Sequence, residues 1–284
     1  MSCAPETAAL VALLRAGKRN PTVYADLVEE AGSARAVLDD EQGLLAGQLL
    51  DTAAAKVTAW SGQGMELLTV LDPGYPANLR AVHDRPPLIF VAGRLAARDG
   101  RAVAVIGTRR PSPSGLDRAR AIAQELVACG YTVVSGLAAG IDTAAHTTAL
   151  AGGGRTIAVI GTGLLCCYPA KNAALQRQIP ADGAVISQFW PDAAPSRKSF
   201  PLRNAVMSGM ALATVIVEAT HTSGARTQAR LALAHGRPVL LVDSLLDQRW
   251  AAELASRPGT HVIRTPAEVP AVVERLTSTR TLVA

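Results

Sequence analysis

The feature that most constrains the fold of this chain is a regular alternation of short apolar runs and longer amphipathic stretches after residue 100. Apolar runs recur at 103–106, 131–134, 156–160, 184–186, 214–217, 238–242 and 261–263. Helical periodicity marks the segments at 116–128, 141–150, 171–179, 202–211, 224–235, 248–256 and 267–277. Apolar strands that alternate with helices are typical of a parallel sheet covered on both faces. The sequence therefore predicts an α/β fold with a doubly wound, mainly parallel sheet.

Two segments of different character precede this alternation. Residues 6–60 show helical spacing interrupted by small-residue turns, which predicts a compact helical module over residues 1–63. Residues 64–95 contain apolar runs at 67–71 and 88–92, the second directly after Pro86-Pro87. Proline beside a strand favours a strand start or a sheet edge, so we expect two extra strands that lead into the main sheet. The main domain is expected to span residues 64–284.

Composition and charge limit the possible partners and compartments. The formal charge of the 284-residue chain is +5, from 28 basic and 23 acidic residues, and the bases are mostly arginine. Arginine suits phosphate contacts, although genome base composition explains the same bias equally well. The cysteines form no Cys-x-x-Cys pair and are expected to be small buried residues in a reducing cytoplasm; they are Cys3, Cys129, Cys166 and Cys167. We expect no secretory signal and no membrane span.

Several strand ends combine glycine with polar side chains. Gly107-Thr108-Arg109 follows the first strand of the alternation, Ser135-Gly136 the second, and Gly161-Thr162-Gly163 the third. Glycine allows close approach of a ligand, and a helix that starts directly after it directs free N–H groups toward that ligand. Ligands of doubly wound sheets bind beyond the carboxyl ends of the strands. For one such turn packing alone explains the glycine, but four consecutive loops that also carry Arg109, Lys171, Asn172, Arg203 and Asn204 favour an anion-binding surface along this edge.

Signatures of catalysis are missing or weak. No Gly-x-Gly-x-x-Gly opens the first helix of the alternation and no Gly-x-x-x-x-Gly-Lys-[Ser/Thr] occurs, so neither a dinucleotide site nor a Walker-type site is predicted. Asp142 and His146 are expected to form a local hydrogen bond that fixes a loop, in preference to a metal site or a proton relay. Glu218 follows a buried strand, but no second carboxylate or nucleophile is placed beside it. We predict a non-enzymatic protein without metal or cofactor.

Six segments follow one another in an informative order: DPGYPANLRAVHDRPPLIFVAGRL, VAVIGTRRPSPSG, VVSGLAAGIDTAAH, TIAVIGTGLLCCYPAKN, FPLRNAVMSG and VIVEATHTSGARTQARLALAHGRPV. This ordered set resembles the DprA/Smf family of DNA-processing proteins over about residues 65–242. The resemblance implies an extended Rossmann-like fold, a homodimer, and binding of single-stranded DNA without strong sequence preference. It also implies loading of RecA recombinase onto incoming DNA during natural transformation.

The resemblance implies DNA or phosphate contacts at the positions that match the family's motifs, and the strand-end glycines join them. The predicted set is Gly107, Thr108, Arg109, Ser135, Gly136, Gly140, Gly161, Gly163, Lys171, Asn172, Arg203, Asn204, Ser223 and Gly224. Four aromatic residues gather near the third and fourth strand ends, namely Tyr168, Phe189, Trp190 and Phe200. One or two of them are candidates to stack on bases, although for any single one a place in the core or in a dimer interface is favoured.

The chain departs from the family pattern at several positions. Ala205 replaces the second arginine of an Arg-Asn-Arg element, Thr222 replaces the lysine usual before Ser223-Gly224, and Gln188 replaces a glutamate. Two expected cations are therefore absent, and DNA affinity is expected to be weaker or differently distributed. After residue 242 the segment VDSLLDQRWAAELASRPGTHVIRTPAEV also departs from the pattern, in a region that the resemblance places near the dimer and recombinase surface. We expect no C-terminal winged-helix domain.

Two other interpretations remain open. A nucleotide-binding sensor, or a phosphoribohydrolase of the lysine-decarboxylase-like kind, has a similar sheet, and its Pro-Gly-Gly-x-Gly-Thr-x-x-Glu loop would fall near residues 218–228. The glutamate position of that loop is not acidic in this chain. A degenerate paralogue that only dimerises with another family member also fits the altered C-terminal quarter.

Overall fold

The computed structural model describes residues 4–221 and 223–281, so Cys3 and Thr222 lie outside the described residues. The strands are β1 (Met65–Thr69), β2 (Leu88–Gly93), β3 (Ala102–Ile106), β4 (Thr132–Ser135), β5 (Thr156–Val159), β6 (Ala184–Ser187), β7 (Ala213–Ile216), β8 (Val239–Val242) and β9 (Thr260–Ile263). The helices are α1 (Ala4–Ala16), α2 (Pro21–Ala31), α3 (Ala34–Gln42), α4 (Ala46–Gly62), α5 (Ala77–Arg80), α6 (Pro113–Ala128), α7 (Ile141–Ala151), α8 (Ala173–Gln178), α9 (Ser199–Met210), α10 (Ala225–Ala234), α11 (Arg249–Ala255) and α12 (Glu268–Thr281).

All the strands form one sheet in the order β1-β2-β6-β5-β4-β3-β7-β8-β9. The seven strands β3 to β9 run parallel, and β1 and β2 are antiparallel to their neighbours at one edge. Val103 of β3 pairs with Val133 of β4 on one side and with Ala213 of β7 on the other. The predicted doubly wound, mainly parallel sheet is confirmed, as are the two extra strands that precede it.

Helices cover both faces of this sheet because successive strand residues point to opposite sides. Ala104 and Ile106 of β3 belong to the same buried cluster as α9, α10 and α11. Val103 and Val105 belong to a second cluster that contains buried residues of α6, α7 and α12. The strands are apolar at nearly every position because both faces are buried, which is why they appear in the sequence as continuous runs.

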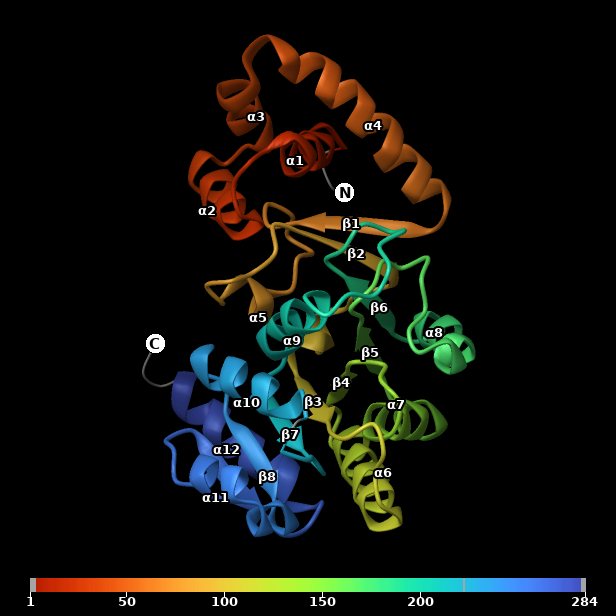
Figure 1. Ribbon diagram of the computed structural model, residues 1–284, viewed down its shortest axis with the longest axis vertical. Coiled ribbons are helices and arrows are strands. Elements are labelled where there is room, and N and C mark those ends of the chain that lie inside the picture. The colour runs from red at the N-terminus through yellow and green to blue at the C-terminus, as the bar shows by residue number, and fades with distance from the viewer. Residues whose placement is uncertain (1–3, 222, 282–284) are drawn as a thin grey trace.

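The N-terminal helices α1 to α4 lie together above β1 at the top of Figure 1. Asn20 caps α2, whose first residue is Pro21, and the Ser33 side chain caps α3 by accepting a hydrogen bond from the backbone N–H of Ala36. Leu10 and Leu13 of α1 are fully buried and join the core cluster that also contains β1 and β2. The apolar core therefore continues from the helices into the sheet, and the division at residue 63 stays a prediction.

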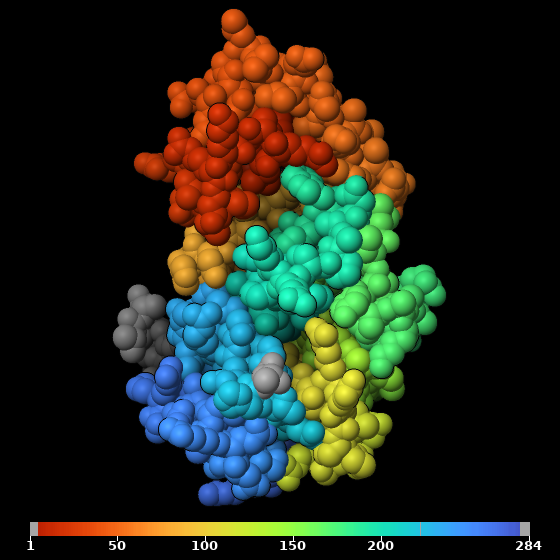
Figure 2. Space-filling view, in the orientation of Figure 1, coloured from red at the N-terminus to blue at the C-terminus, as the bar shows by residue number. Residues whose placement is uncertain are grey.

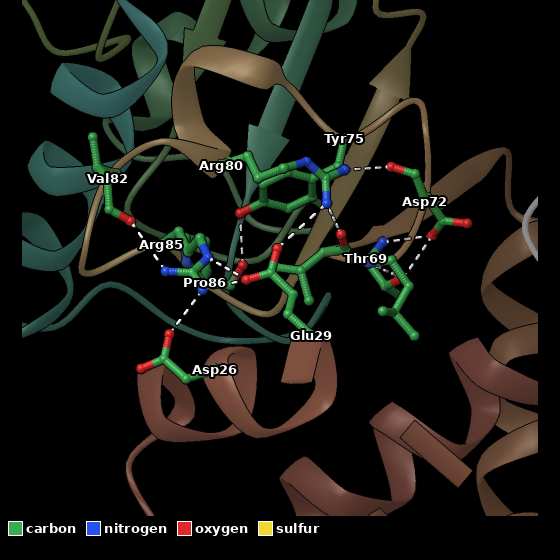
Figure 3. A network of polar contacts seen from close by, with 11 residues as sticks. Asp26, Glu29, Thr69, Asp72, Tyr75, Arg80, Val82, Arg85 and Pro86 are labelled. Carbon is green, nitrogen blue, oxygen red and sulfur yellow. Dashed lines mark hydrogen bonds and ion pairs between the residues drawn. The ribbon is translucent and has the colours of Figure 1, made fainter. Parts of the chain in front are cut away.

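Polar contacts also tie α2 to the chain between β1 and β2 (Figure 3). Arg85 donates from Nη2 to Oδ1 of Asp26 at 2.7 Å and from Nε to Oε2 of Glu29 at 2.8 Å. Tyr75 donates from its hydroxyl to the carbonyl oxygen of Pro86 at 2.6 Å, and burial raises the pKa of this tyrosine. Side chains of the DPGY and HDRPP segments thus connect α2 to the chain between β1 and β2, and we call this set of contacts the polar joint.

Two expectations from the sequence differ from the structure. Cys129 is exposed, and Cys166 and Cys167 are partly exposed free thiols, so the prediction of buried cysteines is wrong for these three residues. Cys129 follows the last residue of α6 and the other two lie in the loop after β5, which are surface positions. The final helix extends to Thr281, beyond the expected end near 277.

Within residues 4–221 and 223–281, every helix is too short or too polar to cross a lipid bilayer.

Candidate nucleic-acid interface

A groove of about 610 Å³ lies at the carboxyl ends of β3 and β7. β4 pairs with one side of β3 and β7 with the other, so this is the point where the strand order reverses, the usual ligand position in a doubly wound sheet. We call it the main groove. Seven predicted residues line it, namely Gly107, Thr108, Arg109, Arg203, Asn204, Ser223 and Gly224. The segment after β3 and the helices α9 and α10 meet there, in the middle of the face shown in Figure 2.

The loop after β3 is held by its backbone, which leaves its arginines free. Thr108 donates its N–H to the carbonyl of Glu218 at 2.6 Å, and its own carbonyl accepts from the N–H of Ile141 at 3.3 Å. A side chain at Gly107 would collide with Ile141 and with the Glu218 carbonyl, so glycine is required for this close approach. Arg109 is exposed at the groove.

The helix that follows this loop does not offer the free N-terminus expected from the sequence. α6 begins at Pro113, several residues after Gly107. Ser112 caps it by accepting from the N–H of Gly115 at 3.0 Å, and Glu218 accepts from the Ser112 hydroxyl at 2.7 Å. A carboxylate of the protein already lies at the positive end of α6. The groups that this loop leaves available to an anion are therefore arginine side chains, and Glu218 has a structural role.

Arg203 of α9 forms a buried cationic wall of the main groove. Its side chain donates to the carbonyls of Gly136 and Val159, the latter at 2.8 Å, and to Oδ1 of Asn204 at 3.0 Å. A side chain at Gly136 would occupy the place of the guanidinium. Burial lowers the pKa of Arg203, and the nearby Asp142 carboxylate opposes that effect.

Asp142 and His146 do not act as the predicted pair. Asp142 accepts from the N–H groups of Gly136 and Ala138 at 3.1 and 3.2 Å, so it does fix a loop, but without the histidine. His146 instead shares a 2.7 Å hydrogen bond between Nδ1 and the Thr156 hydroxyl. The two side chains separate because Asp142 lies at the start of α7, beside the loop, whereas His146 faces β5. Burial lowers the pKa of His146 to about 3.

A smaller hollow of about 100 Å³ adjoins the main groove and shares Arg109 and Arg203 with it. Tyr168 lines this hollow, is 44% exposed, and has its ring centroid 5.6 Å from that of Phe200. The guanidinium carbon of Arg109 lies 5.5 Å from the Phe200 ring and 6.0 Å from the Tyr168 ring. The predicted Gly136 and Gly161 also line it. An exposed aromatic ring thus lies next to the exposed cation.

Trp190 contributes to a different surface. Its ring stacks on Trp60 of α4 at 5.8 Å, and the guanidinium carbon of Arg15 from α1 lies 4.5 Å from its centroid. Trp190 therefore packs where the N-terminal helices meet the loop after β6.

Five predicted residues line neither hollow: Ser135, Gly140, Gly163, Lys171 and Asn172. Ser135 donates to the carbonyl of Val105 at 2.7 Å, and Asn172 donates to the carbonyl of Leu137 at 2.8 Å, so both hold neighbouring loops. Gly140 has a φ of 84°, which glycine adopts readily, and directly precedes α7. Lys171 is exposed on a 3₁₀ turn. As DNA contacts these residues remain predictions.

Other residues that line the main groove were not predicted from the sequence. Arg110 is exposed beside Arg109, and Gln228 of α10 lies one helical turn after Gly224. A search for polar residues that follow each strand-end motif would have found both. Met207 and Ala138 also line the groove, but apolar side chains at such positions carry no signal in a single sequence. Ala205, where the family has a second arginine, is buried in α9.

A separate cluster, His83, Asp84 and His235, offers three ligand atoms that all lie within 4.8 Å of one another. In this structure the His235 ring bonds to Asp84 Oδ1 through Nε2 at 2.7 Å and to the Ser208 hydroxyl through Nδ1 at 2.9 Å. Burial is the largest single effect and raises the pKa of Asp84, but the hydrogen bond with His235 and the charges of His235 and His83 together outweigh it, so the net shift is downward. Ser208 is fully buried, so this Ser-His-Asp chain presents no accessible nucleophile.

Comparison with known families gives one match over most of the chain. Residues 66–278 match the family model for DNA recombination-mediator protein A. The matched range begins at β1 and ends within α12, so it includes every strand and the main groove.

Individual relatives and solved structures agree with this match. Protein Smf of Synechocystis is 42% identical over 190 residues, which is 66% of this chain and 48% of that protein. DNA processing protein DprA of Streptococcus pneumoniae is 40% identical over 180 residues, which is 63% of this chain and 64% of that protein. The matched segment thus covers only about half to two thirds of these curated relatives.

Two solved structures are similar over most of their length. The X-ray structure of DNA processing protein A from Streptococcus pneumoniae has a TM-score of 0.76 at 29% identity, covering 93% of this chain and 97% of that one. A Helicobacter pylori structure, described as giving the single-stranded DNA binding mode of its DNA processing protein A, has a TM-score of 0.63 at 26% identity. It covers 76% of this chain and 96% of that one.

Proposed function

The chain belongs to the DNA recombination-mediator protein A family, and on that basis we propose that it binds single-stranded DNA in the main groove. The relative from Helicobacter pylori is described as binding single-stranded DNA, which supports the proposal for this chain. We further propose that the protein is a cytoplasmic homodimer without catalytic activity. In this role it protects incoming DNA and helps to load RecA recombinase during natural transformation.

One observation carries the proposal. Exposed Arg109 and Arg110 lie in an open groove at the switch point of the sheet, next to the exposed ring of Tyr168. Single-strand binding proteins combine cations that contact the backbone with aromatic rings that stack on bases. Arginine suits phosphate because its planar guanidinium makes paired hydrogen bonds to phosphate oxygens. The main groove and the adjoining hollow together supply both kinds of group.

The absence of catalysis is supported by how the carboxylates near the groove are used. Asp142 binds backbone N–H groups, and Glu218 binds Ser112 at the start of α6. General acid–base chemistry needs a carboxylate within reach of a substrate proton, and both of these groups are engaged with the protein.

Titration of labelled single-stranded and double-stranded oligonucleotides at several salt concentrations tests the proposal. We expect preferential binding of single strands, with a log–log salt slope of roughly −0.7 for each phosphate neutralised. Poly-purine and poly-pyrimidine strands should bind with similar affinity because phosphate contacts carry no base information. Failure to bind single strands at low salt would refute DNA binding by this chain.

The volume of the main groove also supports a second candidate, a small nucleotide ligand. About 610 Å³ lies within the range of about 300–1,000 Å³ typical of small-molecule sites. Competition between adenosine monophosphate and a labelled oligonucleotide, together with an assay for release of free base, distinguishes the two. Free-base release would establish the phosphoribohydrolase alternative, and displacement without release would establish a nucleotide sensor.

A further inference from the structure

A second hollow, of about 460 Å³, lies between α10 and α11. We call it the α10–α11 hollow, and the residues that matter here are Ser223, Arg226, Arg230, Trp250, Glu253 and Arg257. In Figure 1 both helices lie among the C-terminal elements drawn in shades of blue, with α10 above α11. Trp250, Glu253 and Arg257 come from the segment after residue 242, whereas Arg226 and Arg230 belong to α10.

The lining of this hollow is strongly cationic. Arg226 and Arg230 are four residues apart on α10, so they lie on one face of the helix with a rise of about 6 Å between them. Arg257 follows α11 and contributes a third exposed guanidinium. Glu253 is the acidic residue of the lining, and it pairs with Arg249 at 2.8 Å. The hollow therefore carries a net positive charge that its own carboxylate does not offset.

The three arginines differ in how firmly they are held. Arg226 donates to the carbonyl of His221 at 3.0 Å, and its guanidinium carbon lies 5.7 Å from the Trp250 ring. Among the described residues, neither Arg230 nor Arg257 forms an ion pair with a carboxylate. Exposed guanidinium groups without an acidic partner attract anions because no internal charge competes for them.

Ser223 lies where this hollow meets the main groove, because it lines both. It accepts from the N–H of Ala225 at 3.2 Å at the start of α10, so the first turn of that helix separates the two hollows. A polymer that leaves the main groove past Ser223 meets Arg226 and then Arg230 along the same helix.

We propose that the α10–α11 hollow binds the phosphodiester backbone of the same single strand that occupies the main groove, extending the binding path across α10. This inference rests on the proposed function. Trp250 does not offer a ring face for a base, because it is only 6% exposed and the guanidinium carbon of Arg226 lies 5.7 Å from its ring, so the contacts there are to phosphates. The extension adds affinity and length to the site without adding sequence preference.

The test compares oligothymidylates of increasing length with the full chain and with Arg230→Ala/Arg257→Ala. The matched control is Arg98→Ala/Arg177→Ala, which removes two exposed arginines that line neither hollow. For the full chain, we expect the salt slope to steepen as the strand grows beyond the main groove. The double variant of the hollow should lose about 1.4 from that slope for long strands only, at roughly 0.7 for each phosphate.

The possible results separate this inference from the proposed function. Unchanged binding of short strands with weakened binding of long ones, seen in the hollow variant and not in the control, supports the extended path. Equal binding of long strands by the full chain and the hollow variant overturns the extension while leaving the main groove intact. If the full chain binds no strand of any length, the proposed function fails and the extension fails with it. Circular dichroism of each variant checks that the fold is retained.

Discussion

At the scale of single residues, burial decides what an arginine does in this protein. Arg203 is 6% exposed and binds backbone carbonyls, so it shapes the loop after β4 as well as the electrostatic potential of the groove. Arg109 is exposed, and its guanidinium faces aromatic rings and open groove. The first is a structural cation, whereas the second is available to a ligand. Sequence motifs place both at strand ends but do not separate these roles.

Replacement of Arg109 tests whether its exposed guanidinium contacts DNA. We expect Arg109→Ala to weaken single-strand binding to a similar degree for all sequences and to reduce the salt slope by roughly 0.7, because one backbone contact is lost. The control is Arg98→Ala, which removes an exposed arginine just before β3, at the opposite edge of the sheet. Equal affinity of the two variants would place the strand elsewhere on the surface.

The buried His146 predicts a pH dependence of stability. Burial lowers its pKa from 6.5 to about 3, so on acidification the unfolded chain takes up a proton before the folded one does. Its contribution to stability is therefore complete above pH 6.5 and is lost progressively as the pH falls toward 3. Urea unfolding at several pH values should show a decline that approaches about 1.4 kcal/mol per pH unit for this one proton.

His146→Asn separates this contribution from those of other titrating groups. The variant is expected to be less stable at neutral pH, because Asn fills less of the site beside Thr156. Its free energy of unfolding should nevertheless fall less steeply between pH 6.5 and 4 than that of the full chain. Parallel pH profiles for the two proteins would contradict a neutral buried histidine.

At the scale of elements, the loops after the strands are held by contacts within the protein, and the helix N-termini matter less than the sequence indicates. α6 has its N-terminus occupied by Ser112 and Glu218, and the loop after β4 is held by Asp142 and Asn172. The main groove is therefore a rigid frame that presents a few arginines. Preorganised contacts of this kind reduce the entropy lost on binding.

A glycine substitution tests this frame. In Gly136→Ala the new Cβ would occupy the place of the Arg203 guanidinium, which is buried and cannot move into solvent without losing its carbonyl partners. We expect a loss of about 1–3 kcal/mol in the free energy of unfolding together with weaker DNA binding. The control is Gly47→Ala in α4, where a Cβ meets nothing within 4 Å, and it should be neutral or stabilising. Equal stability of the two variants would show that Arg203 adjusts freely.

At the scale of the whole molecule, the N-terminal helices and the sheet share one core and one polar joint. Arg85 joins Asp26 and Glu29 of α2 to the segment that leads into β2, and its side chain is only 14% exposed (Figure 3). The aromatic contact between Trp60 and Trp190 forms a second joint, which connects α4 to the loop after β6. Movement of the helices would therefore disturb the loop next to the strand ends.

Loss of the polar joint should destabilise the molecule. We expect Arg85→Ala to lower the free energy of unfolding by about 1–3 kcal/mol, because the partly buried Glu29 loses the closer of its two arginine partners and keeps only Arg80 at 3.4 Å. Arg35→Ala is the matched control, since it breaks a solvent-exposed pair with Asp39 and should leave the free energy of unfolding nearly unchanged. Chemical unfolding measures both values. Equal values would mean that the helices depend on apolar packing alone.

The order and type of the elements from β1 to α12, and the edge of the sheet where the main groove lies, could be predicted from the alternation of apolar runs and amphipathic stretches. This was possible because strands buried on both faces must be apolar throughout, and parallel strands bring all their carboxyl ends to one edge. The residues of Gly107-Thr108-Arg109 were found for the same reason.

Which of those residues face the groove depends on contacts between segments that are distant in sequence. Lys171 and Asn172 are neighbours in sequence, yet one is exposed and the other is bonded to the carbonyl of Leu137. Glu218 lies far from Ser112 in sequence, yet it accepts a hydrogen bond from the Ser112 hydroxyl at the N-terminus of α6. Arg257 lies close to α10 only because α11 packs beside that helix. Contacts between distant segments depend on how helices pack across the sheet, and local periodicity carries no information about that packing.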